Sequence, residues 1–216
     1  EYTVFIHNAN AKAVILPPDT EHFQISLDAL EKAITPHTRA VIINSPNNPS
    51  GVVYSADTYE KLAALLARKS QEIGHPVYII SDEPYREIIY DGLPILYVPK
   101  FYKDTIICYS YSKSLSLPGE RIGYVLVPDC AADAGEVYTA VCGAGRAMGF
   151  VCAPHLFQDV VLKCLGQTSD MNIYDENRKL LYNGLKEMGY DCVYPSGAFY
   201  LFVKSPDADA KAFSDK

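Results

Sequence analysis

Two short apolar runs enclose one polar stretch, Tyr-Ser-Tyr-Ser-Lys-Ser-Leu-Ser-Leu-Pro-Gly-Glu-Arg-Ile-Gly-Tyr, at residues 109–124. Residues 105–108 lead into it and residues 124–127 follow it, and both runs are typical of strands. Two cations, Lys113 and Arg121, lie in the stretch among hydroxyl side chains. Strands joined by a polar, glycine-bearing loop are a common way for α/β proteins to place reactive groups at strand ends. A single lysine is more often a solvated surface residue than a reactive one. Other residues of the chain are therefore needed to distinguish a reactive Lys113 from a surface Lys113.

The composition is that of a folded globular protein. Of the 216 residues, 49% are hydrophobic and 21% are charged, which supports a substantial core and argues against disorder. The formal net charge of −7 argues against binding to nucleic acid or to an anionic membrane surface. No uninterrupted apolar window of about 18 residues occurs, so we predict no membrane span.

The cysteines and the first residues indicate a reducing compartment. The chain has six cysteines, none of which forms a Cys-x-x-Cys pair, and no Cys/His cluster has the spacing of zinc ligands. The first five residues lack the basic segment and the long apolar segment of a signal peptide. We therefore expect a cytoplasmic protein without a metal site.

Apolar runs alternate with helical patterns over the first 127 residues. Strands are predicted at 14–16, 40–44, 77–81, 105–109 and 124–127, and helices at 27–34 and from Ser55 or Asp57 to about residue 72. Strands that alternate with helices indicate a mostly parallel sheet with flanking helices and right-handed crossovers. The sequence therefore predicts an α/β fold.

Long helical patterns dominate after residue 129. They cover about 130–147, 154–166 and 170–189, and two short strands are predicted at 191–194 and 198–203. We predict that residues 1–167 form a large domain and that residues 168–216 begin a smaller α+β domain. Residues 1–6 are predicted to be strand or loop, and residues 210–216 to be a helix that is cut short. We therefore expect a fragment of a longer protein.

Polar side chains follow three of the predicted strands. Asn48 lies after one strand, Asp82 and Tyr85 after the next, and Ser110 and Lys113 after the third. Because the carboxyl ends of parallel strands meet at one edge of a sheet, we expect these side chains to converge on one crevice.

This set of side chains matches the chemical needs of pyridoxal phosphate (PLP). A lysine amine can form a Schiff base with a carbonyl, and a carboxylate can keep a pyridine nitrogen protonated so that the ring withdraws electrons. An asparagine amide and a tyrosine hydroxyl can bond a phenolate oxygen, and an arginine can bind a phosphate. Each residue alone has a simpler explanation, such as a helix cap for Asp82 or a surface position for Arg121. Only the combination indicates a cofactor site.

Three motifs in this order resemble the class I/II aminotransferases of PLP fold type I, the aspartate aminotransferase superfamily. They are Ser-Pro-Asn-Asn-Pro-Ser-Gly at 45–51, Asp-Glu-Pro-Tyr at 82–85, and Ser-x-x-Lys at 110–113 with an arginine at 121. Gly-Ala-Phe-Tyr at 197–200 also looks like the family's small-domain strand entry. The resemblance covers essentially the whole chain. It implies the PLP-binding large domain and the start of the small C-terminal domain, with the N-terminal and C-terminal parts of the family fold absent.

The resemblance implies a role for each candidate residue. Lys113 would form the Schiff base with the cofactor and then act as general base. Asp82 would pair with the pyridinium nitrogen, and Tyr85 would bond the phenolic oxygen. The cofactor-binding set implied in this way is Asn48, Asp82, Tyr85, Ser110, Lys113 and Arg121.

Asn48 would share the phenolic oxygen, and Ser110 and Arg121 would hold the cofactor phosphate. Other cofactor and substrate contacts of the family have no match in the chain. The upstream glycine/serine phosphate loop and the upstream ring-stacking aromatic are missing. Neither Arg146 nor Arg178 lies in the motif of the arginine that binds the substrate carboxylate. We therefore expect a central fragment with weak PLP retention and little transamination by itself.

The resemblance implies an aminotransferase that moves an amino group from an amino acid to a 2-oxo acid, with aspartate-like or aromatic substrates. It also implies a homodimer in the full-length protein. Two alternatives stay open: a fold-type I carbon–sulfur lyase, and a non-catalytic PLP-binding effector domain of a transcription regulator. Tyr85 favours transfer, because lyase relatives often carry a histidine-containing version of the 82–85 motif. No helix-turn-helix or basic arm supports the effector domain.

Overall fold

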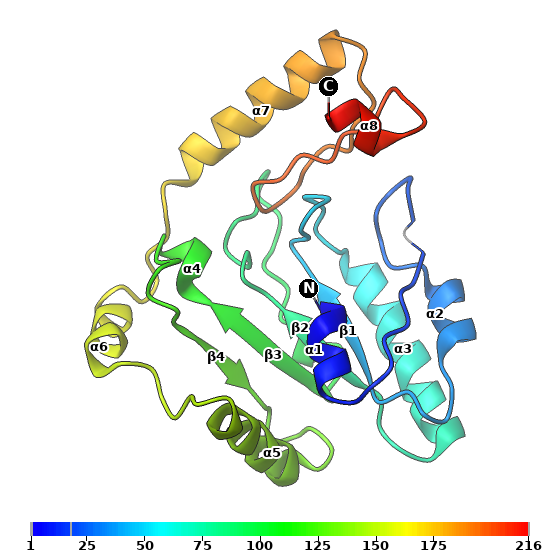
Figure 1. Cartoon of the computed structure of the whole chain (residues 1–216), viewed down its shortest axis with the longest axis vertical. Coiled ribbons are helices and arrows are strands. Elements are labelled where there is room, and N and C mark those ends of the chain that lie inside the picture. The colour runs from blue at the N-terminus through cyan, green and yellow to red at the C-terminus, as the bar shows by residue number, and fades with distance from the viewer. Residues whose placement is uncertain (1, 18, 216) are drawn as a thin grey trace.

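The computed structural model describes residues 2–17 and 19–215 and contains one sheet surrounded by helices (Figure 1). The elements, in chain order, are α1 Tyr2–Asn8, α2 Leu27–Ala33, β1 Ala40–Asn44, α3 Ala56–Ile73, β2 Tyr78–Asp82, η1 Val98–Lys100, β3 Thr105–Ser110, α4 Tyr111–Ser114, β4 Gly123–Leu126, α5 Ala134–Ala147, α6 His155–Lys163, α7 Met171–Glu187 and α8 Ala210–Ser214. The predicted α/β class with a mostly parallel sheet is confirmed.

The sheet has the strand order β1-β2-β3-β4. The first three strands run parallel, and β4 runs antiparallel to β3. The register pairs Asn44 with Asp82 and Asp82 with Cys108, so the last residues of β1 and β2 lie side by side. At the other edge of β3, Ser110 pairs with Gly123 of β4. The carboxyl ends of the three parallel strands therefore form one edge, which faces α7 and the segment after it (Figure 1).

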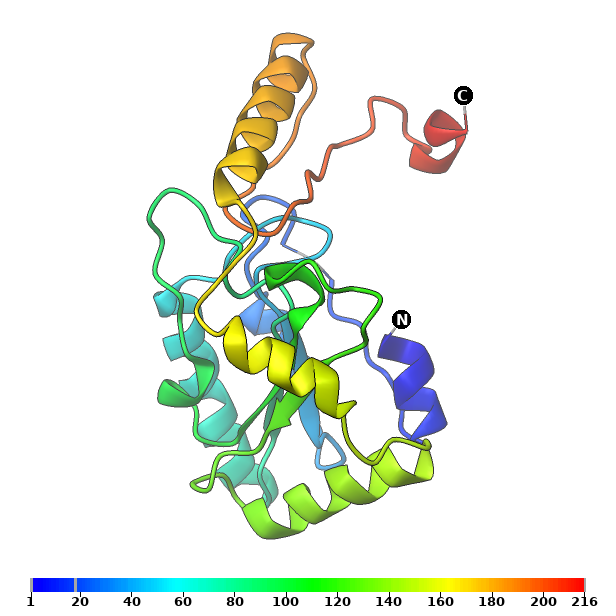
Figure 2. The ribbon, with the colours of Figure 1, turned by 90° about the vertical axis from the view of Figure 1, so that its left-hand side faces the viewer.

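Helices cover both faces of the sheet. The two views place α3 on one face and α1 on the opposite face (Figures 1 and 2). Helix α2 packs against α3, and α5 and α6 lie on the β4 side of the molecule (Figure 1). None of the helices in the described part of the chain is long and apolar enough to cross a membrane.

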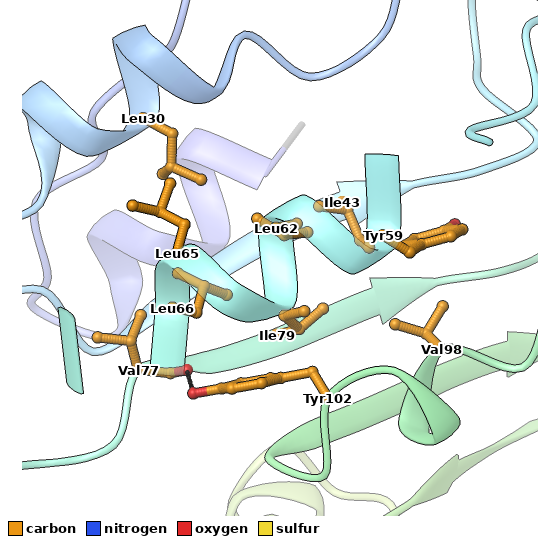
Figure 3. Packing of buried hydrophobic residues seen from close by; sticks show 10 residues of the cluster. All are labelled: Leu30, Ile43, Tyr59, Leu62, Leu65, Leu66, Val77, Ile79, Val98 and Tyr102. Carbon is orange, nitrogen blue, oxygen red and sulfur yellow. Dashed lines mark hydrogen bonds between the residues drawn. The ribbon is translucent and has the colours of Figure 1, made fainter. Parts of the chain in front are cut away.

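The main core lies between α3 and the parallel strands (Figure 3). Leu62 and Leu66 are completely buried, and their spacing of four residues places both on one face of α3. The helix has clear ends, because the Ser55 hydroxyl accepts a hydrogen bond from the Thr58 amide and Gly74 adopts the left-handed conformation at φ 79°. A buried bond from the Tyr102 hydroxyl to the Val77 carbonyl closes the far side of this core.

A second, smaller cluster joins the sheet to the C-terminal segment. Its buried members are Tyr85, Ile88, Tyr90 and Ala198, and Tyr200 packs against them. These contacts cross the predicted domain boundary, so the division at residue 167 stays a prediction.

Four predicted elements are wrong. Residues 14–16 form no strand, since Val14 and Ile15 are 61% and 80% exposed and pair with no neighbouring strand. Residues 2–6 belong to helix α1 and not to a strand or loop, whereas residue 1 lies outside the described residues. Residues 191–194 and 198–203 form only the isolated bridge between Cys192 and Val203, because backbone hydrogen bonds to other segments take up much of this part of the chain.

Candidate active site

The structure brings the ends of β1, β2 and β3 together, as the sequence predicts. Asn44 at the end of β1 donates from Nδ2 to the Asp82 carbonyl at 2.9 Å and to Asp82 Oδ2 at 3.4 Å. Cys108 lies opposite Asp82 on β3. Burial, with the charge of Asp82 as the next cause, raises the pKa of the Cys108 thiol to about 11, so this cysteine is a neutral packing group.

Asp82 is a half-buried carboxylate without a cationic partner among the described residues. Burial raises the pKa of Asp82, and a hydrogen bond from Tyr2 acts in the opposite direction. The Tyr2 hydroxyl donates to Asp82 Oδ2 at 2.5 Å. A partly desolvated carboxylate gains from a positively charged N–H donor. The position of Asp82 therefore suits a protonated ring nitrogen.

Asn48 lies in the loop that follows β1. Its backbone amide donates to Asn44 Oδ1 at 2.8 Å, which ties the loop to the strand end. Gly51 closes the loop at φ 71°, and an added Cβ there would come within 2.6 Å of the Tyr200 carbonyl oxygen. Glycine is required at this position both for its conformation and for the close approach. The Asn48 loop thus packs directly against residues 195–200.

Tyr85 is 5% exposed, and its hydroxyl lies 2.7 Å from the hydroxyl of Tyr200. Burial raises the pKa of Tyr85 well above that of a free tyrosine, and Tyr200 adds to the rise. A side-chain hydrogen bond with Asn48 lowers it. The structure therefore brings Tyr85 and Asn48 together, as expected for two groups that share one acceptor.

Lys113 lies on the short helix α4, directly after β3. The Ser110 hydroxyl caps this helix by accepting from the Ser112 amide at 3.2 Å. Lys113 is half-buried, and its Nζ lies 5.5 Å from the centre of the Phe199 ring. Phe199 also meets the Tyr85 ring edge-on, with centroids 5.4 Å apart. One aromatic side chain therefore touches both the candidate lysine and the candidate phenol.

A buried network supports the helix that carries Lys113. The Tyr109 hydroxyl donates to Glu87 Oε2 at 2.8 Å and lies 2.8 Å from Ser114 Oγ. Since a phenol has one proton, the Ser114 hydroxyl is the donor in the second bond. The residue next to Lys113 is thereby attached to the segment that follows β2.

Arg121 lies on the rim of the site. It is exposed, adopts φ 52°, and donates from its guanidinium to the Pro118 carbonyl at 2.7 Å. The antiparallel pairing of β3 with β4 sets Gly123 opposite Ser110, and the Tyr111 amide donates to the Ile122 carbonyl at 3.1 Å. Arg121 is thus carried to the same end of β3 as Ser110, but its side chain contacts its own turn and not Ser110.

The sequence pattern does not indicate three side chains of the site. Tyr2 lies in a segment that the pattern predicts to be strand or loop. Phe199 and Tyr200 belong to the Gly-Ala-Phe-Tyr motif, which resembles only a strand entry. Their glycine and aromatic content was the available signal, but nothing local indicated contact with residues over 80 positions away.

The fold and the order of these strand-end residues are those expected from the sequence motifs, and comparison with known proteins shows the family. The sequence model of aminotransferase class I and II matches residues 1–216, and the chain belongs to this family. Its cofactor is pyridoxal 5′-phosphate.

Named relatives and solved structures agree with this family. The chain is 32% identical to an aromatic-amino-acid aminotransferase of Thermococcus litoralis over 96% of its length, and 32% identical to an aspartate aminotransferase of Pyrococcus abyssi over 96%. An aminotransferase structure from Eubacterium rectale has 62% identity and a TM-score of 0.97, with 100% of this chain and 54% of that one covered. The structure of an aspartate aminotransferase from Thermotoga maritima has 30% sequence identity and a TM-score of 0.82. The match covers 99% of this chain and 55% of that one.

The chain spans about half the length of the curated relatives it matches, 53% of both the Thermococcus and the Pyrococcus protein.

Proposed function

We propose that the whole protein is a PLP-dependent aminotransferase that moves an amino group from an amino acid to a 2-oxo acid. The observation that carries the proposal is the half-buried Asp82 carboxylate, which has no cationic partner among the described residues. It lies in register with the other strand ends and is followed three residues later by Tyr85. A pyridine nitrogen with a proton fits this carboxylate, and the residues around it fit the other parts of the same cofactor.

Each proposed site residue has a separate task. When bound, PLP supplies a ring that withdraws electrons from the substrate Cα. Lys113 would hold the cofactor covalently, and its amine would take and return the Cα proton. Asp82 would keep the proton on the ring nitrogen. Tyr85 and Asn48 would donate hydrogen bonds to the phenolic oxygen.

Ser110 and Arg121 bind the cofactor phosphate. The Ser110 hydroxyl lies at the N-terminus of α4, and Arg121 follows on the neighbouring rim. A guanidinium offers two parallel donors to a phosphate. Arg121 must exchange its present bond to the Pro118 carbonyl for the phosphate, which its exposed position permits.

We extend the proposal to substrates, assembly and location. Aspartate-like or aromatic amino acids and their 2-oxo acids are the proposed substrates, supported by the names of the relatives. A homodimer is proposed for the whole protein. The six cysteines are free, which supports a reducing, cytoplasmic location.

The proposal is tested by an amino-transfer assay on the full-length protein with PLP. Aspartate or an aromatic amino acid labelled with ¹⁵N is incubated with 2-oxoglutarate, and label in glutamate is measured. We expect transfer by the wild type and a loss of at least about 10³-fold in Lys113→Ala, because the covalent link and the base are both removed.

Lys61→Ala is the matched control, since Lys61 lies on α3 and only pairs with the exposed Asp57. It should transfer at the wild-type rate. A carbon–sulfur lyase would give no transfer in this assay and would instead convert cysteine and water into pyruvate, ammonia and hydrogen sulfide without a 2-oxo acid acceptor. PLP binding with neither reaction would show the non-catalytic effector domain.

A further inference from the structure

The phenol of Tyr200 lies next to the phenol of Tyr85, which is proposed to bond the cofactor. The hydroxyls of Tyr85 and Tyr200 lie 2.7 Å apart, although the two residues are 115 positions apart in the chain. Their rings meet edge-on, with centroids 5.5 Å apart and an interplanar angle of 87°. We infer that Tyr200 is a positioning residue of the site: once the cofactor is bound, Tyr200 donates its proton to the Tyr85 oxygen and so directs the Tyr85 proton at the cofactor. This inference rests on the proposed function.

The direction of the bond follows from the number of protons. Each phenol has one proton to donate, and its oxygen can accept further bonds. If Tyr85 donated to Tyr200, its only proton would be used within the pair and could not reach the phenolic oxygen of PLP. If Tyr200 donates, Tyr85 accepts one bond and gives the next. An anionic oxygen attracts the Tyr85 proton more strongly than a neutral phenol does, which fixes this order.

The segment that carries Tyr200 is held rigidly. The Ala198 amide donates to the Ile88 carbonyl at 2.8 Å, and the Tyr90 hydroxyl donates to the Ala198 carbonyl at 2.6 Å. The amide of Gly197 donates to the Gly51 carbonyl at 2.8 Å. These bonds tie the segment both to the residues after β2 and to the Asn48 loop. Tyr200 is therefore a fixed group and not a mobile surface side chain.

The segment that carries Tyr200 packs closely against the Asn48 loop and against the residues after β2. A Cβ on Gly197 would come within 2.7 Å of the Pro46 side chain and 2.9 Å of the Ile88 carbonyl. Ala198 is completely buried and adopts φ 54°. A strained residue held in place by its surroundings is common where a side chain has to be placed accurately. Here that placement sets the neighbouring phenol against Tyr85.

A chain of hydrogen bonds strengthens its last member. A phenol that accepts a bond becomes a better donor, by about 10–30% per bond. Donors to the phenolic oxygen of PLP stabilise its negative charge and lower the pH at which the bound cofactor loses its proton. The titratable groups that surround the Tyr85 hydroxyl are Tyr200, Asp82 and Tyr2. The Lys113 amine contacts the ring of Phe199, and that ring contacts Tyr85.

The test is a pH titration of the visible absorption of PLP bound to the full-length protein. In Tyr200→Phe, which keeps the ring and removes only the hydroxyl, the midpoint should rise by roughly 0.3 pH unit. In Tyr85→Phe it should rise further. Because Tyr200 acts through Tyr85, the double variant should match Tyr85→Phe alone.

Tyr102→Phe is the matched control, since it loses a buried hydroxyl bond to the Val77 carbonyl in the other core; its midpoint should equal that of the wild type. An unchanged midpoint in Tyr200→Phe would overturn the inference. It would also be overturned if Tyr200→Phe raised the midpoint as much in the Tyr85→Phe variant as it does in the wild type. A wild-type protein that titrates but transfers no amino group would overturn the proposed function alone. A wild-type protein that binds no PLP would overturn both.

Discussion

Asp82 illustrates how a single residue is prepared for a bound partner. Its carboxylate is half-buried, and Tyr2 and Asn44 supply its side-chain hydrogen bonds without supplying a charge. Burial raises its pKa, so the ionised form is less favourable in the folded protein than in the unfolded chain. In the proposed site, such a residue costs stability until a cationic ring nitrogen binds to it.

Asp82→Asn should therefore stabilise the cofactor-free protein at pH 7 and abolish amino transfer. A group whose pKa is raised by folding contributes stability below its unfolded pKa and loses it as pH rises through its folded pKa. The urea midpoint of Asp82→Asn should exceed that of the wild type at pH 7, and the difference should disappear at about pH 3, where both states hold a neutral carboxyl. Transfer should fall at least about 100-fold. A variant that is less stable at pH 7 would argue against a cofactor-dependent carboxylate.

The convergence of the site residues could be predicted from the sequence, but their supporting contacts could not. Asp82, Tyr85 and Lys113 directly follow predicted strands, and parallel strands bring their ends together in any fold of this type. Tyr2 and Tyr200 reach the site from distant segments, so no local pattern carries that information. The position of Arg121 on the rim of the site could not be predicted either, because it depends on a turn in which Arg121 adopts φ 52°.

At the scale of elements, the parallel strands and α3 hold the site residues in place. Predicted boundaries for β1, β2 and β3 agree with the structure to within one residue. These runs are buried and rich in β-branched residues, so burial and local preference agree. The antiparallel direction of β4 could not be predicted, because strand order and direction depend on the connection and not on the strand itself. The strands predicted at 14–16, 191–194 and 198–203 do not form, because these apolar residues have no neighbouring strand with which to build a ladder.

The α3 core predicts the largest effect on stability. Leu66→Ala should reduce the free energy of unfolding by about 2–5 kcal/mol, since it leaves a cavity in a completely buried position between α3 and the sheet. Urea denaturation of the full-length protein measures it. Gln71→Ala, at an exposed position of the same helix, should stay within about 0.5 kcal/mol. Equal effects of the two substitutions would contradict this packing.

Arg178 joins α7 to the segment that follows β2 and to residue 195, and so links distant parts of the molecule. Its side chain is only 3% exposed and pairs with Asp91 at 2.8 Å and with Asp175. The guanidinium donates to the Pro195 carbonyl at 2.8 Å and lies 4.2 Å from the centre of the Tyr90 ring. A residue of the C-terminal segment is thus buried among residues that follow β2, close to the segment that carries Tyr200.

Arg178→Met should lower the free energy of unfolding by about 2–4 kcal/mol, because it leaves the Pro195 carbonyl and Asp91 without their partner. It should also speed hydrogen exchange over residues 195–200, and therefore shift the cofactor titration as Tyr200→Phe does. Lys179→Met is the neighbouring control, and its loss of an exposed pair with Asp175 should leave hydrogen exchange unchanged. Unchanged exchange in Arg178→Met would show that the segment is held without the arginine.

Locating the lysine that holds PLP tests the proposed function at its centre. The full-length protein is loaded with PLP, reduced with borohydride so that the link becomes permanent, digested, and analysed by mass spectrometry. The pyridoxyl group should be found on Lys113, in the peptide that contains Ser110. A pyridoxyl group on any other lysine, or amino transfer by a protein that carries none on Lys113, would contradict the proposed role of Lys113.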